Sequence, residues 1–182
     1  LNLTLDPADR WQIRFRGEKT VGQLAFRDFA ANVSPEPGAT NAGNPYLVPE
    51  TAWFTQLAVE RRFWDRGALT LTAEREFLSD VVDLIPIDNR FDAPGNIGDG
   101  WRQLLMLEMT LPTDKLAIPG GQVRLKLTKR DSRVTDPVTG EKRRIRDQWP
   151  HWMELQTSKN IPSLESVLGI DFFLGYDKTA YR

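Results

Sequence analysis

The chain has 182 residues, and its 24 Lys and Arg residues against 25 Asp and Glu residues give a formal net charge of −1, which excludes the basic excess usual for nucleic-acid-binding proteins. It has no cysteine, which excludes disulfides, thiolate metal sites and cysteine nucleophiles. No stretch approaches the ~18 consecutive apolar residues of a membrane-spanning helix, whereas a transmembrane β-barrel, whose lipid face uses every second residue, is not excluded.

Apolar and polar residues alternate along most of the chain, and no segment of comparable length shows a helical periodicity. The alternation is strict in 11–16, 69–74 and 123–128, and it holds in 105–111 except at Met106. Such a pattern predicts β-strands that have one apolar and one polar face. The expected strands are, in chain order, 1–5, 9–17, 52–64, 68–82, 101–112, 121–135, 149–159 and 165–180.

The connections between these strands alternate between short and long. Short turns are expected at Asp6–Asp9, Trp64–Gly67, Pro112–Gly121 and Asn160–Glu165. Long connections are expected at Glu18–Glu50, Leu84–Gly100 and Asp136–Pro150. This alternation is typical of an antiparallel, up-and-down transmembrane β-barrel, which has tight periplasmic turns and long external loops. Several expected strands exceed the ~9–11 residues that cross the hydrocarbon, so their surplus should project beyond the membrane.

Six tryptophans lie near the ends of the expected strands, and none lies in the middle of one. A hydrophobic core would place some of them in mid-strand. Because indole rings prefer the boundary between hydrocarbon and water, this placement predicts an aromatic girdle at the membrane interface. The predicted girdle residues are Trp11, Trp53, Trp64, Trp101, Trp149 and Trp152.

Charged side chains occupy the alternate positions of the same strands, opposite the apolar ones. In a barrel that holds water or a plug these side chains face the lumen, where Glu74 and Glu76 are expected to join an ion-pair network rather than form an acid–base pair. A soluble β-sandwich shows the same alternation with its polar face in solvent, so parity alone leaves both folds open. The predicted lumen-facing residues are Arg14, Arg16, Glu60, Glu74, Glu76, Glu108, Arg124, Lys126 and Asp171.

One connection and the strands around it resemble a known family. The segment Asn44–Thr51 reads NPYLVPET and is similar to the NPxLxPE(T/S) segment in the barrels of TonB-dependent outer-membrane receptors. The strand Thr55–Phe63 and the segment Asp80–Ile85 that ends the next strand occupy the positions expected from that family. The stretch Lys19–Phe29 is similar to the family's RTVxRPxFxDL stretch.

The resemblance implies that residues 1–182 are a partial β-barrel domain of about eight strands, taken from a barrel of about 22. The plug domain, the TonB box and the final strands of the family are expected to lie outside this chain. The implied location is the outer membrane of a bacterial cell, and the implied function is energy-coupled uptake of a siderophore-like ligand, cobalamin, a carbohydrate or a peptide, without enzymatic activity.

The implied partners are outer-membrane lipid and lipopolysaccharide, the TonB inner-membrane complex acting through the plug domain, and a small-molecule or oligomeric nutrient. Loop Glu18–Glu50 is expected to contribute most to ligand contact, because long loops on a rigid wall commonly carry specificity. Two alternatives remain open. One is a complete small eight-stranded outer-membrane barrel with an anchor or adhesion role, and the other is a soluble β-sandwich binding module.

Three further groups of residues could carry chemistry. The basic run Lys142–Arg146 could contact lipopolysaccharide phosphates, but acidic neighbours favour a solvated hairpin arm. Asp88, Asp92 and Asp99 lack the spacing of a calcium loop and are expected to be turn residues. His151 is expected to have a structural role at the interface. No catalytic, cofactor-binding or metal-binding residue is predicted.

Overall fold

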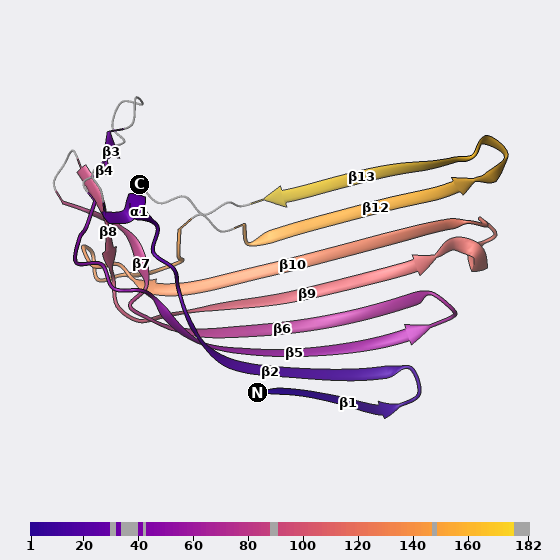
Figure 1. Cartoon of the computed structure of the whole chain (residues 1–182), viewed down its shortest axis with the longest axis horizontal. Coiled ribbons are helices and arrows are strands. Elements are labelled where there is room, and N and C mark those ends of the chain that lie inside the picture. The colour runs from indigo at the N-terminus through magenta and orange to yellow at the C-terminus, as the bar shows by residue number, and fades with distance from the viewer. Residues whose placement is uncertain (30–31, 34–39, 42, 88–90, 147–148, 177–182) are drawn as a thin grey trace.

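The fold is built on one large antiparallel sheet, whose long strands follow one another in sequence order (Figure 1). The computed structural model describes residues 1–29, 32–33, 40–41, 43–87, 91–146 and 149–176. The strands of the large sheet are, in spatial order, β1 (Asn2–Ala8), β2 (Trp11–Val21), β5 (Thr51–Phe63), β6 (Gly67–Ser79), β9 (Gly100–Pro112), β10 (Gly121–Thr135), β12 (His151–Ile161) and β13 (Ser166–Tyr176). The short strand β11 (Lys142–Arg143) pairs with the end of β10.

The predicted all-β, antiparallel order of eight strands is confirmed, and two of its details change. The first turn was predicted at Asp6–Asp9, but β1 continues to Ala8 and the chain turns at Asp9–Arg10. The pairing with β2 shifts register between Leu5 and Ala8, which absorbs Pro7. Proline has no amide hydrogen and is tolerated at a bulge of an edge strand. The predicted end of the last strand, 177–180, lies outside the described residues.

The second change is that the predicted strand 68–82 ends early, because its last residue belongs to a second sheet. Strand β6 stops at Ser79, and Asp80 turns the chain with a positive φ of 58°. The second sheet has four short strands, which the sequence analysis did not predict. Its order is β3 (Asn32–Val33), β4 (Thr40–Asn41), β8 (Phe91–Asn96) and β7 (Val82–Pro86). The short helix α1 (Phe26–Phe29) precedes it.

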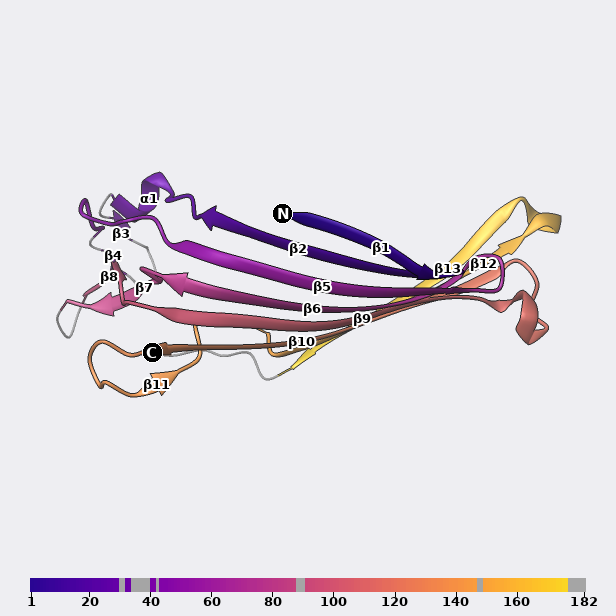
Figure 2. The same ribbon diagram turned by 90° about the horizontal axis from the view of Figure 1, so that it is seen from below.

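The short connections lie at one end of the large sheet and the long ones at the other (Figure 1). The short-turn end includes the 3₁₀ turns η1 (Thr113–Leu116) and η2 (Pro162–Leu164). The long connections carry the second sheet at the opposite end, called the loop end here. Figure 2 shows that the large sheet is strongly twisted and curved. Strands β1 and β13 form its edges and do not pair with each other within the described part of the chain.

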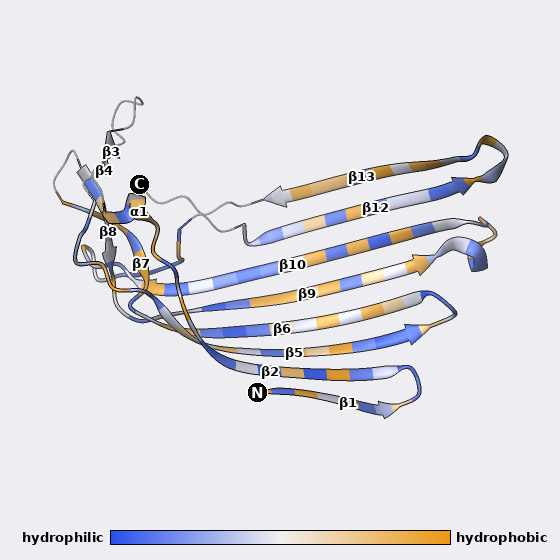
Figure 3. Ribbon diagram, viewed as in Figure 1, coloured by the Kyte–Doolittle hydropathy of each residue, from blue (hydrophilic) through white to orange (hydrophobic). Residues whose placement is uncertain are grey.

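The strand register collects apolar side chains on one face of the sheet, called the apolar face here. Alternation along single strands is visible as orange and blue bands in Figure 3. One continuous row of cross-strand neighbours contains an apolar residue from every long strand. In order, this row is Leu5, Ile13, Val59, Leu71, Leu107, Leu127, Met153 and Leu174. The opposite, polar face holds the intervening residues.

The two faces differ in how crowded they are. On the apolar face Leu71 is 46% exposed and Leu105 is 49% exposed, and no second layer of described residues covers them. On the polar face the small residues Ala58, Thr72 and Thr128 are each only 4% exposed. Longer neighbouring side chains crowd around them, as expected on the inner side of a curved sheet.

The main buried core lies at the loop end, on the polar side of the sheet. It is formed by Ala52, Leu78, Val81, Ile97, Val134 and Ile145. The backbone of Val81 donates to the carbonyl of Gly98 and accepts from Ile97, which ties the connection between β6 and β9 together. The long connections are therefore packed onto the end of the sheet rather than extended away from it.

Replacing Leu78, which is 2% exposed, by alanine should loosen this core. Leu→Ala substitutions in buried cores cost about 2–5 kcal/mol. We expect faster hydrogen exchange in residues 81–98, measured by mass spectrometry, in the Leu78→Ala variant. Leu69→Ala, on the exposed apolar face, is the control and should leave exchange in 81–98 unchanged. Equal acceleration in both variants would contradict a separate loop-end core.

Candidate functional site: a charged groove on the polar face

All nine residues predicted to face a lumen lie on the polar face of the sheet. Register places Arg16 beside Gln56, which in turn neighbours Glu74. In another row Glu108 neighbours Lys126. The nine residues are Arg14, Arg16, Glu60, Glu74, Glu76, Glu108, Arg124, Lys126 and Asp171. The alternation in sequence therefore placed them correctly relative to one another.

Ion pairs and charge-assisted hydrogen bonds connect several of these side chains. Arg14 lies 3.0 Å from the Glu60 carboxylate, and Arg62 donates to the same carboxylate at 2.6 Å. Gln56 donates to Glu74 at 2.7 Å. Each partly exposed pair contributes only about 0–1 kcal/mol. Their main effect is to hold long side chains in fixed positions over the polar face.

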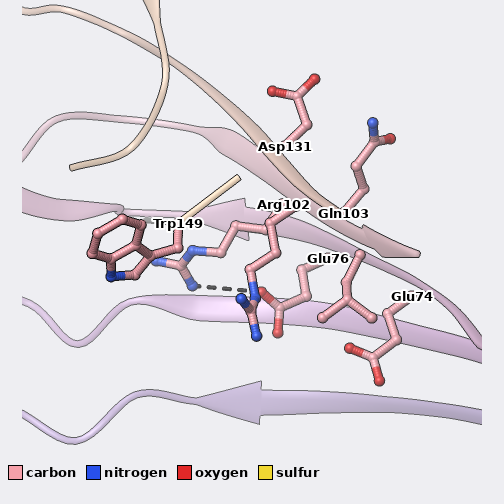
Figure 4. Close-up of a pocket in the computed structure, with 8 residues that line it drawn as sticks. Glu74, Glu76, Arg102, Gln103, Asp131 and Trp149 are labelled. Atoms are coloured by element: carbon pink, nitrogen blue, oxygen red, sulfur yellow. Dashed lines mark hydrogen bonds and ion pairs between the residues drawn. The ribbon is translucent and has the colours of Figure 1, made fainter. Parts of the chain in front are cut away.

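A groove of about 370 Å³ lies near the loop end of this network (Figure 4). It is lined by Glu74, Glu76, Arg102, Gln103, Leu104, Arg130, Asp131 and Trp149. Figure 4 shows Glu74, Glu76 and Arg102 extending from one side of the strands, and Gln103 and Asp131 extending from the other. This agrees with the register, which assigns the first three to the polar face.

Arg102 is the best-held charged group in the groove. Its Nη1 and Nη2 donate to the two carboxylate oxygens of Glu50 at 2.7 and 3.2 Å, and Nη1 is 3.5 Å from Glu76. A two-point contact between guanidinium and carboxylate fixes direction as well as distance. The pair ties the long connection before β5 to strand β9. Arg102, Glu50 and Arg130 were not predicted as site residues, although the alternation along this strand indicates that Arg102 lies on the polar face.

Trp149 supplies an aromatic surface at the same place. Its ring centroid is 6.3 Å from that of Trp152. A Cβ at Gly175 would lie 2.5 Å from the Trp152 ring and 3.2 Å from the Trp149 ring, so glycine is what allows both rings to pack on β13. The carbonyl of the buried Pro150 accepts a hydrogen bond from the Arg130 amide at 2.7 Å. This bond holds the segment that carries Trp149 against β10.

The six tryptophans do not share one face. Register places Trp11, Trp53 and Trp101 on the apolar face. Trp64 lies in the turn after β5. Trp152 lies on the polar face beside Thr128 and donates to Glu154 at 2.7 Å, and Trp149 lines the groove. The prediction that the tryptophans lie near strand ends came from their positions in the sequence. The face on which each one lies depends on strand register, which the sequence pattern around residues 149–152 did not determine.

The segment Asn44–Thr51 is anchored by side-chain amides. Asn96 donates to the carbonyl of Val48 at 2.8 Å and accepts from the Val48 amide at 2.9 Å. Asn44 donates to the carbonyl of Pro94 at 3.0 Å, and Leu47 is buried. These contacts dock the segment on β8 and deliver Glu50 to Arg102.

The basic run Lys142–Arg146 forms a hairpin arm with ion pairs inside it. Arg143 lies 2.8 Å from both Asp83 and Asp136. Arg144 is 3.3 Å from Asp131, and Arg146 is 3.6 Å from Asp83. The arginines of this run are thus paired with carboxylates of neighbouring strands and connections.

The remaining predicted positions carry little chemistry in the described residues. Asp88 lies outside them, Asp92 and Asp99 are exposed, and no group of potential metal ligands occurs in the described part of the chain. His151 stacks on Tyr176 at 4.8 Å on the apolar face. No helix among the described residues is long and apolar enough to cross a membrane.

No protein-family model matches the chain, and no curated protein sequence matches it.

Asp136 anchors the turn of the hairpin arm. Its carboxylate accepts from the backbone amides of Thr139 and Val138 and from Arg143. These hydrogen bonds lower the pKa of Asp136 from 3.8 to about 2. The bond from the Thr139 amide has the largest effect, followed by those from Arg143 and Val138. Because the folded pKa lies below the unfolded one, the carboxylate stabilises the turn fully above about pH 4 and loses this effect as pH falls through about 2.

We expect the amide protons of Val138 and Thr139 to stay protected from exchange above pH 4 and to lose protection towards pH 2. Hydrogen exchange read by mass spectrometry across this window measures the change. Asp136→Asn retains an oxygen acceptor but does not titrate, so its profile should lack the step. A wild-type profile without a step, or the same step in the variant, would contradict the role of this carboxylate.

Proposed function

We propose that this chain forms part of the wall of a larger transmembrane β-barrel in a bacterial outer membrane, and that the barrel takes up a nutrient by energy-coupled transport as in TonB-dependent receptors. The observation that carries the proposal is the continuous apolar row across all the long strands, on an exposed face that no described segment covers. Apolar surface of this extent is stable next to lipid and unfavourable next to water.

The apolar band runs obliquely to the strands, which further supports the proposal. The row that contains Phe15, Leu57 and Leu105 continues as Lys129 and His151. Nearer the short-turn end, another cross-strand row starts with Trp11 on β2 and Arg61 on β5. From β6 to β13 all its members are apolar. These are Leu69, Met109, Leu125, Leu155 and Phe172.

A band parallel to a bilayer crosses strands obliquely when the strands are tilted, and barrel strands tilt by about 35–45°. Its length is also suitable. On β9 the alternate residues from Leu105 to Leu111 are apolar, a distance of about 20 Å at ~3.3 Å per residue. This approaches the ~25 Å apolar band of outer-membrane barrels.

The two alternative folds are less well supported. A complete eight-stranded barrel would pair β1 with β13, and a soluble sandwich would cover the apolar face with a second sheet. Neither arrangement occurs among the described residues. The long connections gathered at one end, and the resemblance of Asn44–Thr51 to the receptor segment, favour the receptor.

In this proposal the polar face lines the lumen, and the groove around Arg102 lies just below the external loops. Two arginines, three acidic residues and the indole of Trp149 line the groove and suit a polar ligand that has several hydrogen-bonding groups and one apolar face. Carbohydrates, peptides and siderophore-like ligands all have this character. The wall residues bind and orient the ligand, while an inner-membrane complex acts on a plug domain to open a path.

Leu107→Arg should prevent assembly in the outer membrane, because a cation at the middle of the lipid face costs about 2–4 kcal/mol. Glu108→Arg changes the next residue of the same strand, on the polar face, and should assemble normally. The measurement is the amount of intact protein in isolated outer membranes, together with its resistance to protease. Equal assembly of both variants, or equal failure, would overturn the assignment of the faces.

Trp149→Ala and Arg102→Ala should each reduce ligand uptake by about fivefold or more, since truncating a tryptophan or arginine at the centre of a binding site commonly costs over 1 kcal/mol. Cells that carry the intact gene are compared with a deletion strain for uptake of labelled ferric siderophore, cobalamin, oligosaccharide and peptide. Arg124→Gln, on the polar face but outside the groove, is the matched control. Uptake that persists after the protonmotive force is collapsed would contradict energy coupling.

A further inference from the structure

The charged residues of the apolar face have one sign almost throughout. At the paired positions of the long strands, register assigns a single acidic residue to this face, Asp131, which lies 3.3 Å from Arg144. The other charged residues there are all basic. They are Lys19, Arg61, Arg75, Lys129, Arg133 and Lys159. The polar face, in contrast, holds both signs.

Of the cations on the two faces of the large sheet, those that form ion pairs lie on the polar face, where Arg16 also lies 5.5 Å from the Phe54 ring. On the polar face Arg14 and Arg102 contact carboxylates. On the apolar face the guanidinium of Arg75 lies 4.0 Å from the ring centroid of Trp101 and 5.3 Å from that of Phe77. Lys19 lies 6.0 Å from the Trp53 ring. Aromatic faces hold a cation in place without neutralising its charge.

None of these six cations lies within 4.0 Å of a carboxylate oxygen in the described part of the chain. Arg133 is the register neighbour of Trp101, and Arg75 donates to Gln103 at 2.8 Å. Positive charge beside an apolar surface is stabilised best by an external anion that also has apolar parts.

Three of these cations and the aromatic rings form one compact arrangement at the loop side of the apolar band. A single cross-strand row runs through Lys19, Trp53, Phe77, Trp101 and Arg133. Four strand spacings of ~4.8 Å make this row about 19 Å long. Arg75 lies one row nearer the middle of the apolar band. The five row residues and Arg75 are called the cationic–aromatic row below.

We propose that the cationic–aromatic row binds the phosphates of a lipid A-type glycolipid in the leaflet on the loop side. The proposal rests on the proposed membrane function. Charge-assisted hydrogen bonds from lysine and arginine suit phosphate oxygens. Three cations spread over about 19 Å match a rigid head group with more than one phosphate better than a lipid with a single phosphate. The rings of Trp53 and Phe77 are exposed and lie between the cations, where they offer apolar surface to the sugar rings and acyl chains of the lipid.

The structure therefore points to a different site from the basic run Lys142–Arg146. The arginines of that run already contact Asp83, Asp131 and Asp136, so their charge is compensated within the protein. The cationic–aromatic row could not be recognised from charge density in the sequence, because its three cations are separated by long stretches of chain and meet only in the sheet.

The test uses the intact protein in detergent, titrated with lipid A, dephosphorylated lipid A or phosphatidylethanolamine, with bound lipid counted by native mass spectrometry. Wild-type protein should prefer lipid A over both other lipids. Lys19→Gln, Arg75→Gln and Arg133→Gln should each weaken lipid A binding about fivefold, and the triple variant about a hundredfold. The double variant Arg124→Gln/Lys126→Gln removes polar-face cations and should bind like wild type.

Other results would overturn the inference. Equal binding of lipid A and its dephosphorylated form, equal binding of phosphatidylethanolamine, or full competition by millimolar inorganic phosphate would each exclude a glycolipid-phosphate site. A triple variant that binds like wild type would do the same. Recovery of the wild-type protein from isolated outer membranes is measured in parallel. Its absence there would overturn the proposed membrane function itself, whereas its presence with unselective lipid binding would overturn only this inference.

Discussion

The structure depends on the register between neighbouring strands. A β-strand alternates its side chains between two faces, so a shift of one residue between two strands would move a whole apolar set to the wrong side. Here the register is continuous from β2 to β13, with one shift in the pairing of β1 with β2, and it keeps most of the leucine, isoleucine, valine and methionine side chains of the long strands on one face. Every other feature, including the charged groove and the cationic–aromatic row, follows from which face a residue occupies.

The two faces perform different physical tasks with the same residue types. Arginine on the polar face is held by carboxylates, as in the contact between Arg102 and Glu50, whereas Arg75 on the apolar face is held by aromatic rings. The first arrangement keeps charge balanced inside a crowded surface. The second keeps positive charge available to the surroundings. Charge composition of the whole chain, which is nearly neutral, hides this separation.

Local alternation was sufficient to predict the long strands and the side of the sheet on which Arg14, Glu74 or Lys126 lies. Alternation was insufficient in the connections, where apolar and polar residues no longer alternate with a period of two. The second sheet arises because Asp80 adopts a positive φ and diverts the chain after β6, and neither event changes the hydropathy pattern. The groove was missed for a related reason. Trp149 lines it from a connection, and Glu50 holds its Arg102 from another connection, and both positions depend on tertiary contacts such as those of Asn96 and Pro150.

The bulge at Pro7 has a consequence for whatever strand lies beside β1. An edge strand in hydrocarbon needs a neighbour for each of its free amide and carbonyl groups, since an unmet group there costs several kcal/mol. Pro7 offers no amide hydrogen, and the bulge breaks the even spacing of the donors and acceptors that remain. In the proposed wall, a strand that pairs with the outer edge of β1 would therefore meet an interrupted ladder of donors and acceptors, which would restrict the registers in which it could pair.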